Sequence, residues 1–249
     1  MDHKIKLFNL PNLLTLVNLF AGCVALVLVF SAGGLQYVPY CTVISLVADY
    51  LDGMAARFTH TYTEVGKELD SLADMVSFGA VPGAIFYILL TYHYRAVSSA
   101  ENEWLVMAYS SPAFLITLFS ALRLAKFNLD SRQSEGFIGL ATPACTIFVI
   151  GLLLVFLHND YNLSSTILNP VVLYGLVGVL SYLLIAELPM FSFKFKHFGI
   201  DGNKLRYVFI ILSAVLLGLF KFAGIALTVA AYIGISIIQL FTAPKQIIK

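Results

Sequence analysis

Charge is scarce in this chain of 249 residues: only 12% of the residues are Asp, Glu, Lys or Arg, whereas 59% are hydrophobic. A soluble domain usually carries about twice that fraction of charge, so a water-soluble globular protein is excluded. The net charge is +1, and no cluster of basic residues resembles a nucleic-acid footprint. We therefore expect membrane lipids as the surroundings of this protein, and no nucleic-acid partner.

Cysteine is sparse too, and neither cysteine nor histidine occurs at metal-ligand spacing. Cys23, Cys41 and Cys145 are isolated within apolar segments, which predicts buried thiols rather than disulfides. The sequence also lacks repeats and low-complexity linkers. We therefore treat residues 1–249 as a single integral membrane domain.

Hydrophobic residues come in blocks of about twenty, the length of a helix that crosses a hydrocarbon layer of ~30 Å. This pattern predicts an all-α fold, a polytopic membrane helix bundle with about eight transmembrane helices. The first block lacks a convincing cleavage site, so we interpret it as a retained helix rather than a signal peptide. The predicted spans are 12–31, 36–57, 69–92, 104–127, 139–157, 166–186, 206–220 and 222–241.

The basic residues are distributed unequally between the predicted loops. If the N-terminus is inside, thirteen of the fifteen Lys and Arg residues fall on one side, and only Arg95 and Lys221 fall on the other. Because cytoplasmic loops carry an excess of basic residues, we expect a multi-pass protein of the cell (inner) membrane. Both termini and the 57–68 loop should then be cytoplasmic.

Four aspartates are concentrated in the stretch DYLDGMAARFTHTYTEVGKELDSLAD, residues 49 to 74. Asp49 and Asp52 are i,i+3 neighbours on one helix, and Asp70 and Asp74 are i,i+4 neighbours on the next, so each pair shares a face. Two antiparallel helices joined by about a dozen residues could aim the pairs at each other. Four carboxylates beside hydrocarbon need a compensating charge. With no His or Cys at metal-ligand spacing to these acids, the natural partners are Mg²⁺, Mn²⁺ or Ca²⁺.

Two further residues in this stretch indicate a phosphate ligand. Gly53 leaves room for a ligand to approach the helix backbone, and Arg57 offers a planar fork of donors that suits phosphate. Together with the acids they suggest a metal-bound diphosphate. The alternatives are structural ion pairs at helix ends and an ion or metal transporter, since intramembrane carboxylates often mark an ion pathway. The number and spacing of the acids disfavour structural ion pairs. A transporter is disfavoured because the other predicted spans contain no comparable polar residues that would continue an ion pathway.

The stretch resembles the signature of the CDP-alcohol phosphotransferases, D-x2-D-G-x2-A-R-x8-G-x3-D-x3-D. The match covers all eight specified positions with the spacing intact. The resemblance implies the CDP-alcohol phosphotransferase fold, a homodimer and a cytoplasm-facing site. It also implies two divalent metal ions, Mg²⁺ or Mn²⁺, with Ca²⁺ as a non-catalytic substitute. The matching residues are Asp49, Asp52, Gly53, Ala56, Arg57, Gly66, Asp70 and Asp74.

The same resemblance assigns roles to individual residues. Asp74 would serve as general base besides binding metal, and Gly53 and Arg57 would contact the CDP-lipid. Thr63, in the variable part of the signature, is a candidate for the diphosphate. Asn12, in a Pro-Asn-Leu-Leu-Thr run similar to that of many family members, is a candidate for the nucleotide. The metal ligands carried over are Asp49, Asp52, Asp70 and Asp74.

The acceptor alcohol is indicated by weaker signals. The runs Leu72–Gly79 and Ala121–Asn128 resemble those of membrane-embedded (type II) phosphatidylserine synthases, and a Gly-Leu-Ala-Thr-Pro-Ala run departs from their pattern at Ala141. This resemblance implies transfer of a phosphatidyl group from CDP-diacylglycerol to the hydroxyl of L-serine, giving phosphatidylserine and CMP. The alternatives are the same chemistry with glycerol 3-phosphate or an inositol phosphate as acceptor.

Arg123 and Asn128 have a physical interpretation that fits serine. A planar guanidinium such as that of Arg123 could hold the serine carboxylate, and Asn128 could accept from the ammonium or order the loop. The alternative for Arg123 is that it anchors a helix end at anionic lipid.

Overall fold

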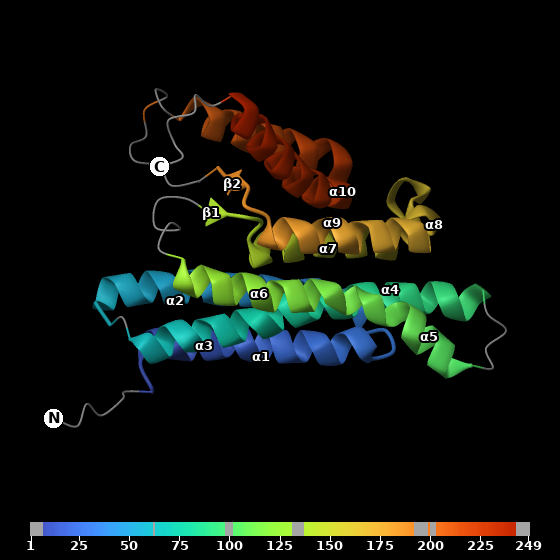
Figure 1. Ribbon diagram of the computed structural model, residues 1–249, viewed down its shortest axis with the longest axis horizontal. Helices are drawn as coiled ribbons and strands as arrows, with labels where there is room; N and C mark the ends of the chain where they lie inside the picture. Colours follow the sequence, from blue (N-terminus) through green and yellow to red (C-terminus); the bar gives the residue numbers. More distant parts are fainter. Residues whose placement is uncertain are drawn as a thin grey trace.

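The computed structural model describes residues 7–61, 63–97, 102–130, 137–191, 199 and 203–242. Its helices lie roughly side by side in layers (Figure 1). The helices of the first half of the chain lie together, α7 and α9 lie over them, and α10 packs against α7. We call the end where α2 ends and α3 begins the acid end, and the end where α4 ends and α5 begins the far end.

The first two helices form an antiparallel pair. Helix α1, Leu10–Phe30, starts where the Asn9 side chain accepts a hydrogen bond from the Asn12 amide, a typical N-cap. A short 3₁₀ turn, Leu35–Tyr37, leads into α2, Val38–Thr59. Helix α2 ends at Thr59, and the next residue, His60, adopts a left-handed conformation. The connector to α3 is therefore only residues 60–63, shorter than the dozen residues that the sequence suggested.

The next segment is one helical path that changes its winding in the middle. Helix α3, Glu64–Asp74, continues into a π-helical turn, Met75–Ala80, and then into α4, Val81–Val97. The Thr146 hydroxyl donates to the Phe78 carbonyl at 3.1 Å, and the Thr117 hydroxyl donates to the Gly79 carbonyl at 3.0 Å. Hydroxyls of neighbouring helices thus bind carbonyls of the π-helical turn. Such turns often occur at functional sites, and this one follows Asp74 directly.

The second half of the chain is built from shorter helices and a reversal. Two-residue strands β1 and β2 pair antiparallel and join the α6–α7 connector to the α9–α10 connector. They are a small exception to the predicted all-α fold. The bounds are α5, Glu103–Ser110; α6, Leu115–Leu129; β1, Phe137–Ile138; α7, Thr142–His158; α8, Ser164–Ile167; α9, Pro170–Ile185; and β2, Pro189–Met190. Short 3₁₀ turns, Ser111–Phe114 and Asp160–Asn162, precede α6 and α8.

Helix α10, Lys204–Thr242, consists of two arms. Lys221 breaks it with φ +48°. A Cβ on Gly224 would collide with the Leu216 carbonyl oxygen, although residues eight apart in a straight helix are well separated. The arms therefore fold back on each other, and glycine allows the close approach. The predicted turn near Lys221 is confirmed.

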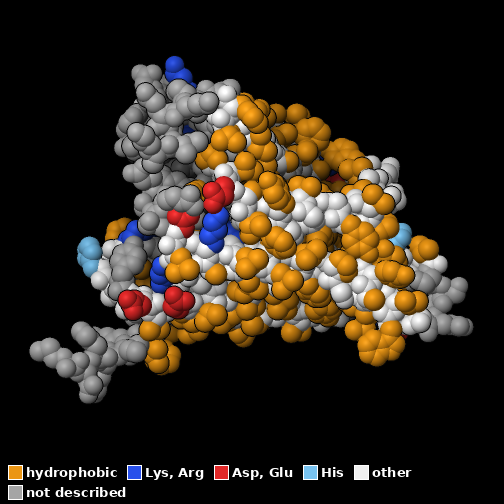
Figure 2. All heavy atoms as spheres, in the orientation of Figure 1, with side chains coloured by type: hydrophobic (Ala, Val, Ile, Leu, Met, Phe, Trp, Pro, Cys, Tyr) orange, Lys and Arg blue, Asp and Glu red, His pale blue; other side chains and the backbone are white. Residues whose placement is uncertain are grey.

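All eight predicted ranges fall on helices, and the structure supports a multi-pass membrane protein. Among the described residues, four helical segments are long and apolar enough to cross a membrane. Hydrophobic side chains cover most of the face seen in Figure 2, and charged ones gather toward the acid end. Helix α2 is not one of the four, and α7 and α9 are apolar but shorter. The four segments are Leu10–Phe30, Glu64–Val97, Glu103–Leu129 and Lys204–Phe241.

The core surrounds α4. Phe86, Leu89 and Leu90 are almost fully buried, and they belong to one apolar cluster with residues of α7 and α9. Close packing at the acid end depends on small residues: a Cβ on Gly22 of α1 would collide with Ser77 Oγ of the π-helical turn. Small residues are typical of membrane helix contacts. They bring α1 against the segment that follows the acids.

Candidate metal centre and substrate sites

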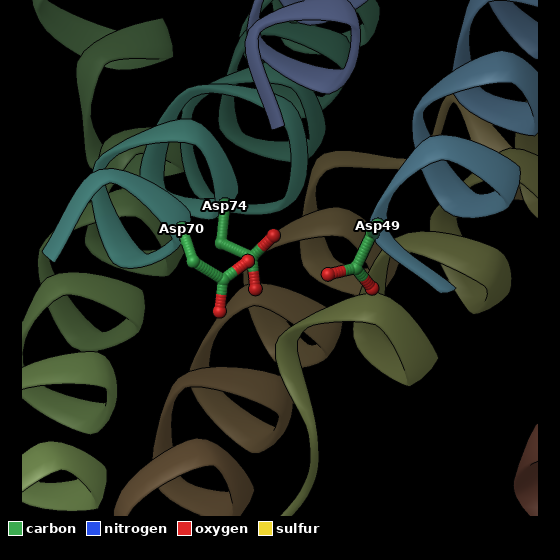
Figure 3. A group of neighbouring side chains, drawn as sticks. All are labelled: Asp49, Asp70 and Asp74. Carbon is green, nitrogen blue, oxygen red and sulfur yellow. The ribbon is translucent and has the colours of Figure 1, made fainter. Parts of the chain in front are cut away.

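Three of the four signature acids meet between α2 and α3. One carboxylate oxygen from each of Asp49, Asp70 and Asp74 lies within 4.8 Å of the others. Figure 3 shows Asp70 and Asp74 side by side on one helix, with Asp49 facing them from the other. Helical periodicity explains this arrangement, because residues four apart share a face.

Asp52 lies outside this group of three. It is buried, and its Oδ2 accepts a hydrogen bond of 2.6 Å from the Thr15 hydroxyl. The sequence predicted four acids in one small space; the structure brings three within ligand distance of one another and holds the fourth against α1. Metal binding by Asp52 remains a prediction.

Helix α1 contributes a row of buried polar side chains that the sequence reasoning missed as a group. Asn12, Thr15 and Asn18 are spaced i,i+3 and are at most 3% exposed. The Asn18 amide donates to Asp74 Oδ1 at 3.1 Å, as Thr15 does to Asp52. Two acids are thus oriented by α1, and the three-residue spacing of polar residues in an apolar helix was the signal for it.

The chemistry of the acid group fits a divalent cation. All three side chains offer only oxygen, which is what Mg²⁺ and Mn²⁺ prefer. Asp70 Oδ1 is buried without a hydrogen-bond partner, and an orphaned buried acceptor of this kind is costly unless something binds it. Neither of the ion pairs found among the described residues includes a signature acid. The group is therefore compatible with metal binding.

A cavity of about 450 Å³ opens beside the acids. A Cβ added to Gly53 would meet only the end of the Arg57 side chain, at 4.0 Å, so packing alone does not require glycine there. A Cβ on Gly66 would press on Thr63 Oγ1 and Asn12 Oδ1, at 3.0 and 3.1 Å. The cavity is lined by Pro11, Asn12, Thr15, Asp52, Gly53, Ala56, Thr61, Thr63, Glu64, Gly66, Lys67 and Asp70.

Three of the four predicted CDP-lipid contacts therefore line this cavity, while Arg57 lines a neighbouring one. Arg57 Nε donates to the Gly53 carbonyl at 2.9 Å, and its side chain faces a second cavity of about 350 Å³ with Tyr50, Met54 and Phe58. The Thr63 hydroxyl is the N-cap of α3 and accepts from the Gly66 amide at 3.0 Å. The Asn12 amide nitrogen donates to the Leu7 carbonyl at 2.8 Å.

Arg123 of α6 is buried. It is 7% exposed, within electrostatic range of Asp74, and Nη1 donates to the Thr142 hydroxyl at 3.1 Å. The guanidinium also lies over the Phe127 ring, 5.2 Å from its centroid. Nε is buried without a partner. A side chain in this position is not a lipid-facing anchor, so the structure disfavours the alternative interpretation of Arg123.

Asn128 connects two helices. Its side-chain amide donates to Ser71 Oγ at 2.8 Å, and its backbone carbonyl accepts from Lys67 Nζ at 2.9 Å. Both partners are on α3, one turn apart. Of the two roles considered for Asn128, ordering of the chain is the one that these contacts favour.

The sequence is similar to proteins of one enzyme family. The profile of the CDP-alcohol phosphatidyltransferase family matches residues 8–242. The chain is similar to the CDP-diacylglycerol–serine O-phosphatidyltransferase of Helicobacter pylori (strain J99), with 33% identity over 76% of this chain and 74% of the relative. The enzyme of that name from Methanocaldococcus jannaschii is 30% identical over 70% of this chain and 72% of the relative. The one from Bacillus subtilis is 33% identical over 60% and 69%.

Proposed function

This chain belongs to the CDP-alcohol phosphatidyltransferase family, and on that premise we propose that it transfers the phosphatidyl group of CDP-diacylglycerol to L-serine. The products would be phosphatidylserine and CMP. The observation that carries the proposal is that three clustered carboxylates, a cavity and a buried arginine lie together at one end of the bundle. The cavity is of the size typical of small-molecule sites. The relatives that share about a third of its sequence carry the name of the serine enzyme.

The acids would hold two divalent cations, Mg²⁺ or Mn²⁺, through Asp49, Asp52, Asp70 and Asp74. Such ions neutralise the charge of a diphosphate and of its leaving group. Asn12, Gly53 and Thr63 would bind the CDP-lipid from the main cavity, and Arg57 would bind it from the neighbouring one. Gly53 supports this assignment, because the space beside it is open.

Asp74 would take up the proton of the serine hydroxyl. The hydrogen bond from Asn18 fixes the orientation of its carboxylate, and burial keeps bulk water from competing for it. The serine oxygen forms a bond to the phosphorus that bears diacylglycerol, and the bond from that phosphorus to the CMP oxygen breaks with its electron pair leaving on CMP. Atoms and charge balance once the proton is on Asp74.

Arg123 would select the acceptor. A carboxylate is the group that distinguishes serine from glycerol 3-phosphate and inositol phosphates, and a guanidinium binds it with two parallel hydrogen bonds. Arg123 Nε is buried and has no hydrogen-bond partner in the structure, so it can donate to such a carboxylate. Asn128 would assist by holding the end of α6 against α3.

The protein would work as a homodimer in the cell membrane, with about eight spans and with the acid end in the cytoplasm. Helix ends carrying Arg57, Lys67 and Lys126 lie at the acid end, and the end of α4 that carries Arg95 lies at the opposite end. The break at Lys221 is at that opposite end too, because the neighbouring Phe222 packs against His158 at the end of α7. This separation supports the orientation. Single cysteines at Thr61 and Ser165 in a Cys-free variant should be labelled from opposite sides of the membrane; labelling from the same side would refute it.

The test of function is an acceptor screen. Purified protein with CDP-diacylglycerol and Mg²⁺ or Mn²⁺ receives serine, glycerol 3-phosphate or an inositol phosphate separately, and both CMP release and the lipid product are followed. We expect CMP and phosphatidylserine with serine alone. Turnover with a phosphorylated acceptor and not with serine would support the phosphatidyl transfer reaction but refute serine as the acceptor. No CMP release with any acceptor, in protein that remains folded, would argue against the transferase and leave the transporter alternative.

A further inference from the structure

Helix stability does not explain why a lysine occupies position 67. It is in the first turn of α3, one residue after the signature glycine Gly66. The N-terminus of a helix carries partial positive charge, so a cation there is unfavourable. The family signature does not specify this position.

The cavity beside the acids has an uneven set of charges. Its lining includes the acids Asp52, Glu64 and Asp70. Among the described residues that line it, Lys67 is the only basic side chain. Arg57, the cation that the signature supplies, faces the neighbouring cavity and bonds to the Gly53 carbonyl. In the described lining, an anion in the main cavity would therefore have one basic side chain to bind, that of Lys67.

The present contact of Lys67 can be exchanged easily. Its ammonium has three donors, and it donates to the neutral backbone carbonyl of Asn128 at 2.9 Å. The residue is exposed, so this hydrogen bond contributes little stability. A phosphate oxygen makes a shorter and stronger charge-assisted bond with an ammonium. The link between α3 and α6 does not depend on Lys67 alone, because Ser71 also binds the Asn128 side chain.

We propose that Lys67 binds the diphosphate of the CDP-activated donor, moving from the Asn128 carbonyl to a phosphate oxygen when the cavity fills. This inference rests on the proposed function only in taking a CDP-lipid as donor; it does not depend on which alcohol accepts. Lys67 then supplies a second cation besides Arg57. CMP, which carries one phosphate, would be held less tightly than a diphosphate, and this difference favours product release.

The experiment compares CDP and CMP binding to purified protein in nanodiscs of neutral lipid with Mg²⁺, by titration calorimetry. Lys67→Gln should weaken CDP binding about tenfold, as expected for the loss of one charge-assisted hydrogen bond. CMP binding should change by less than about threefold, since the bond sought is to the second phosphate. Lys67→Arg should restore CDP affinity to within about threefold of wild type. Lys126→Gln is the matched control, because Lys126 lies at the same end in an exposed ion pair with Glu187, and it should bind both nucleotides normally.

A second variant separates binding from structure. Ser71→Ala breaks the side-chain link to Asn128 and leaves Lys67 in place. It should keep CDP affinity; if it reproduces the effect of Lys67→Gln, Lys67 acts by joining the helices and the proposal is wrong. The proposal is equally overturned if Lys67→Gln binds CDP as wild type does. It also fails if the loss appears only in nanodiscs with anionic lipid, since the partner would then be a headgroup. Wild-type protein that binds no CDP would contradict the proposed function itself.

Discussion

The two ends of the bundle both bury polar side chains, but they satisfy them differently. At the far end the Tyr94 and Tyr174 hydroxyls are 2.9 Å apart, and Tyr174 also donates to the Tyr109 carbonyl at 2.6 Å. Thr91 bonds to Ser110 at 3.1 Å. These partners all come from the protein itself, so the network holds α4, α5 and α9 together and needs no ligand.

The acid end leaves buried groups without a protein partner. Asn18 Oδ1, Asp70 Oδ1 and Arg123 Nε are orphaned around three converging carboxylates. At the far end Asp160 also has an oxygen without a partner, but no second acid in the described residues joins it in a metal-compatible group. Unsatisfied buried polar groups cost free energy, so a cluster of them marks a place prepared for a ligand. The polar groups of the far end therefore stabilise the fold, whereas those of the acid end are available to bind a ligand.

The largest effect should follow from neutralising a clustered acid. We expect Asp70→Asn and Asp49→Asn each to reduce turnover below detection, because the amide removes charge that a metal ion requires. Asp160→Asn, the same change at the far end, should keep wild-type turnover. CMP release at saturating substrates measures all three. Activity in Asp70→Asn comparable to that in Asp160→Asn would abolish the distinction between the ends.

The second largest effect on turnover should follow from removing the proposed general base, Asp74. Asp74→Asn keeps the size of the side chain but cannot take up the serine proton, so kcat should fall by roughly 10²–10⁴-fold. If Asp74 also binds metal, the fall will exceed that range. Steady-state kinetics at saturating serine and CDP-diacylglycerol give kcat. A change confined to KM would show that Asp74 binds substrate without moving a proton.

A smaller, selective effect is expected at the buried arginine. Arg123→Lys keeps the charge and loses the planar fork, so KM for serine should rise about tenfold while KM for CDP-diacylglycerol stays within about twofold. Arg95→Lys, in the exposed ion pair of the far end, is the control. Wild-type serine kinetics in Arg123→Lys would remove the physical argument for serine as acceptor.

The smallest effect on activity should come from the far-end network. Tyr174→Phe removes two hydrogen bonds in a part-buried site, and the free energy of unfolding should fall by about 1–3 kcal/mol. Turnover per folded molecule should not change. Thermal unfolding in detergent, with kcat measured in parallel, tests both statements. A loss of kcat without a loss of stability would mean that the far end takes part in the reaction.

Features with a local periodic origin were predictable from the sequence. Blocks of twenty apolar residues indicated the helices, the turn at Lys221 was found, and three- and four-residue spacings put the acids on shared faces. The separation of Asp52 from the other acids was not predictable, because it depends on Thr15 of a different helix. The π-helical turn after Asp74 was missed for the same reason, since hydroxyls of α6 and α7 bind its carbonyls.

Contacts between helices far apart in the sequence carry the remaining information about the site. Nothing in the pattern of α3 indicates that Lys67 and Ser71 meet Asn128 of α6, since that depends on how the bundle packs. Gly53 was interpreted as a place of close approach, and the space beside it is indeed open. The direction of Arg57, into a neighbouring cavity, follows from its bond to the Gly53 carbonyl and could not be seen in the spacing.

The central claim is that the acid end binds divalent cations through its clustered carboxylates. Its most direct test is Mn²⁺ binding to metal-stripped protein, followed by electron paramagnetic resonance of the free ion. Wild type and Asp160→Asn should bind Mn²⁺ with equal affinity, and Asp49→Asn, Asp70→Asn and Asp74→Asn should each bind it at least about tenfold more weakly. Equal Mn²⁺ binding by wild type and the three cluster variants would contradict the claim.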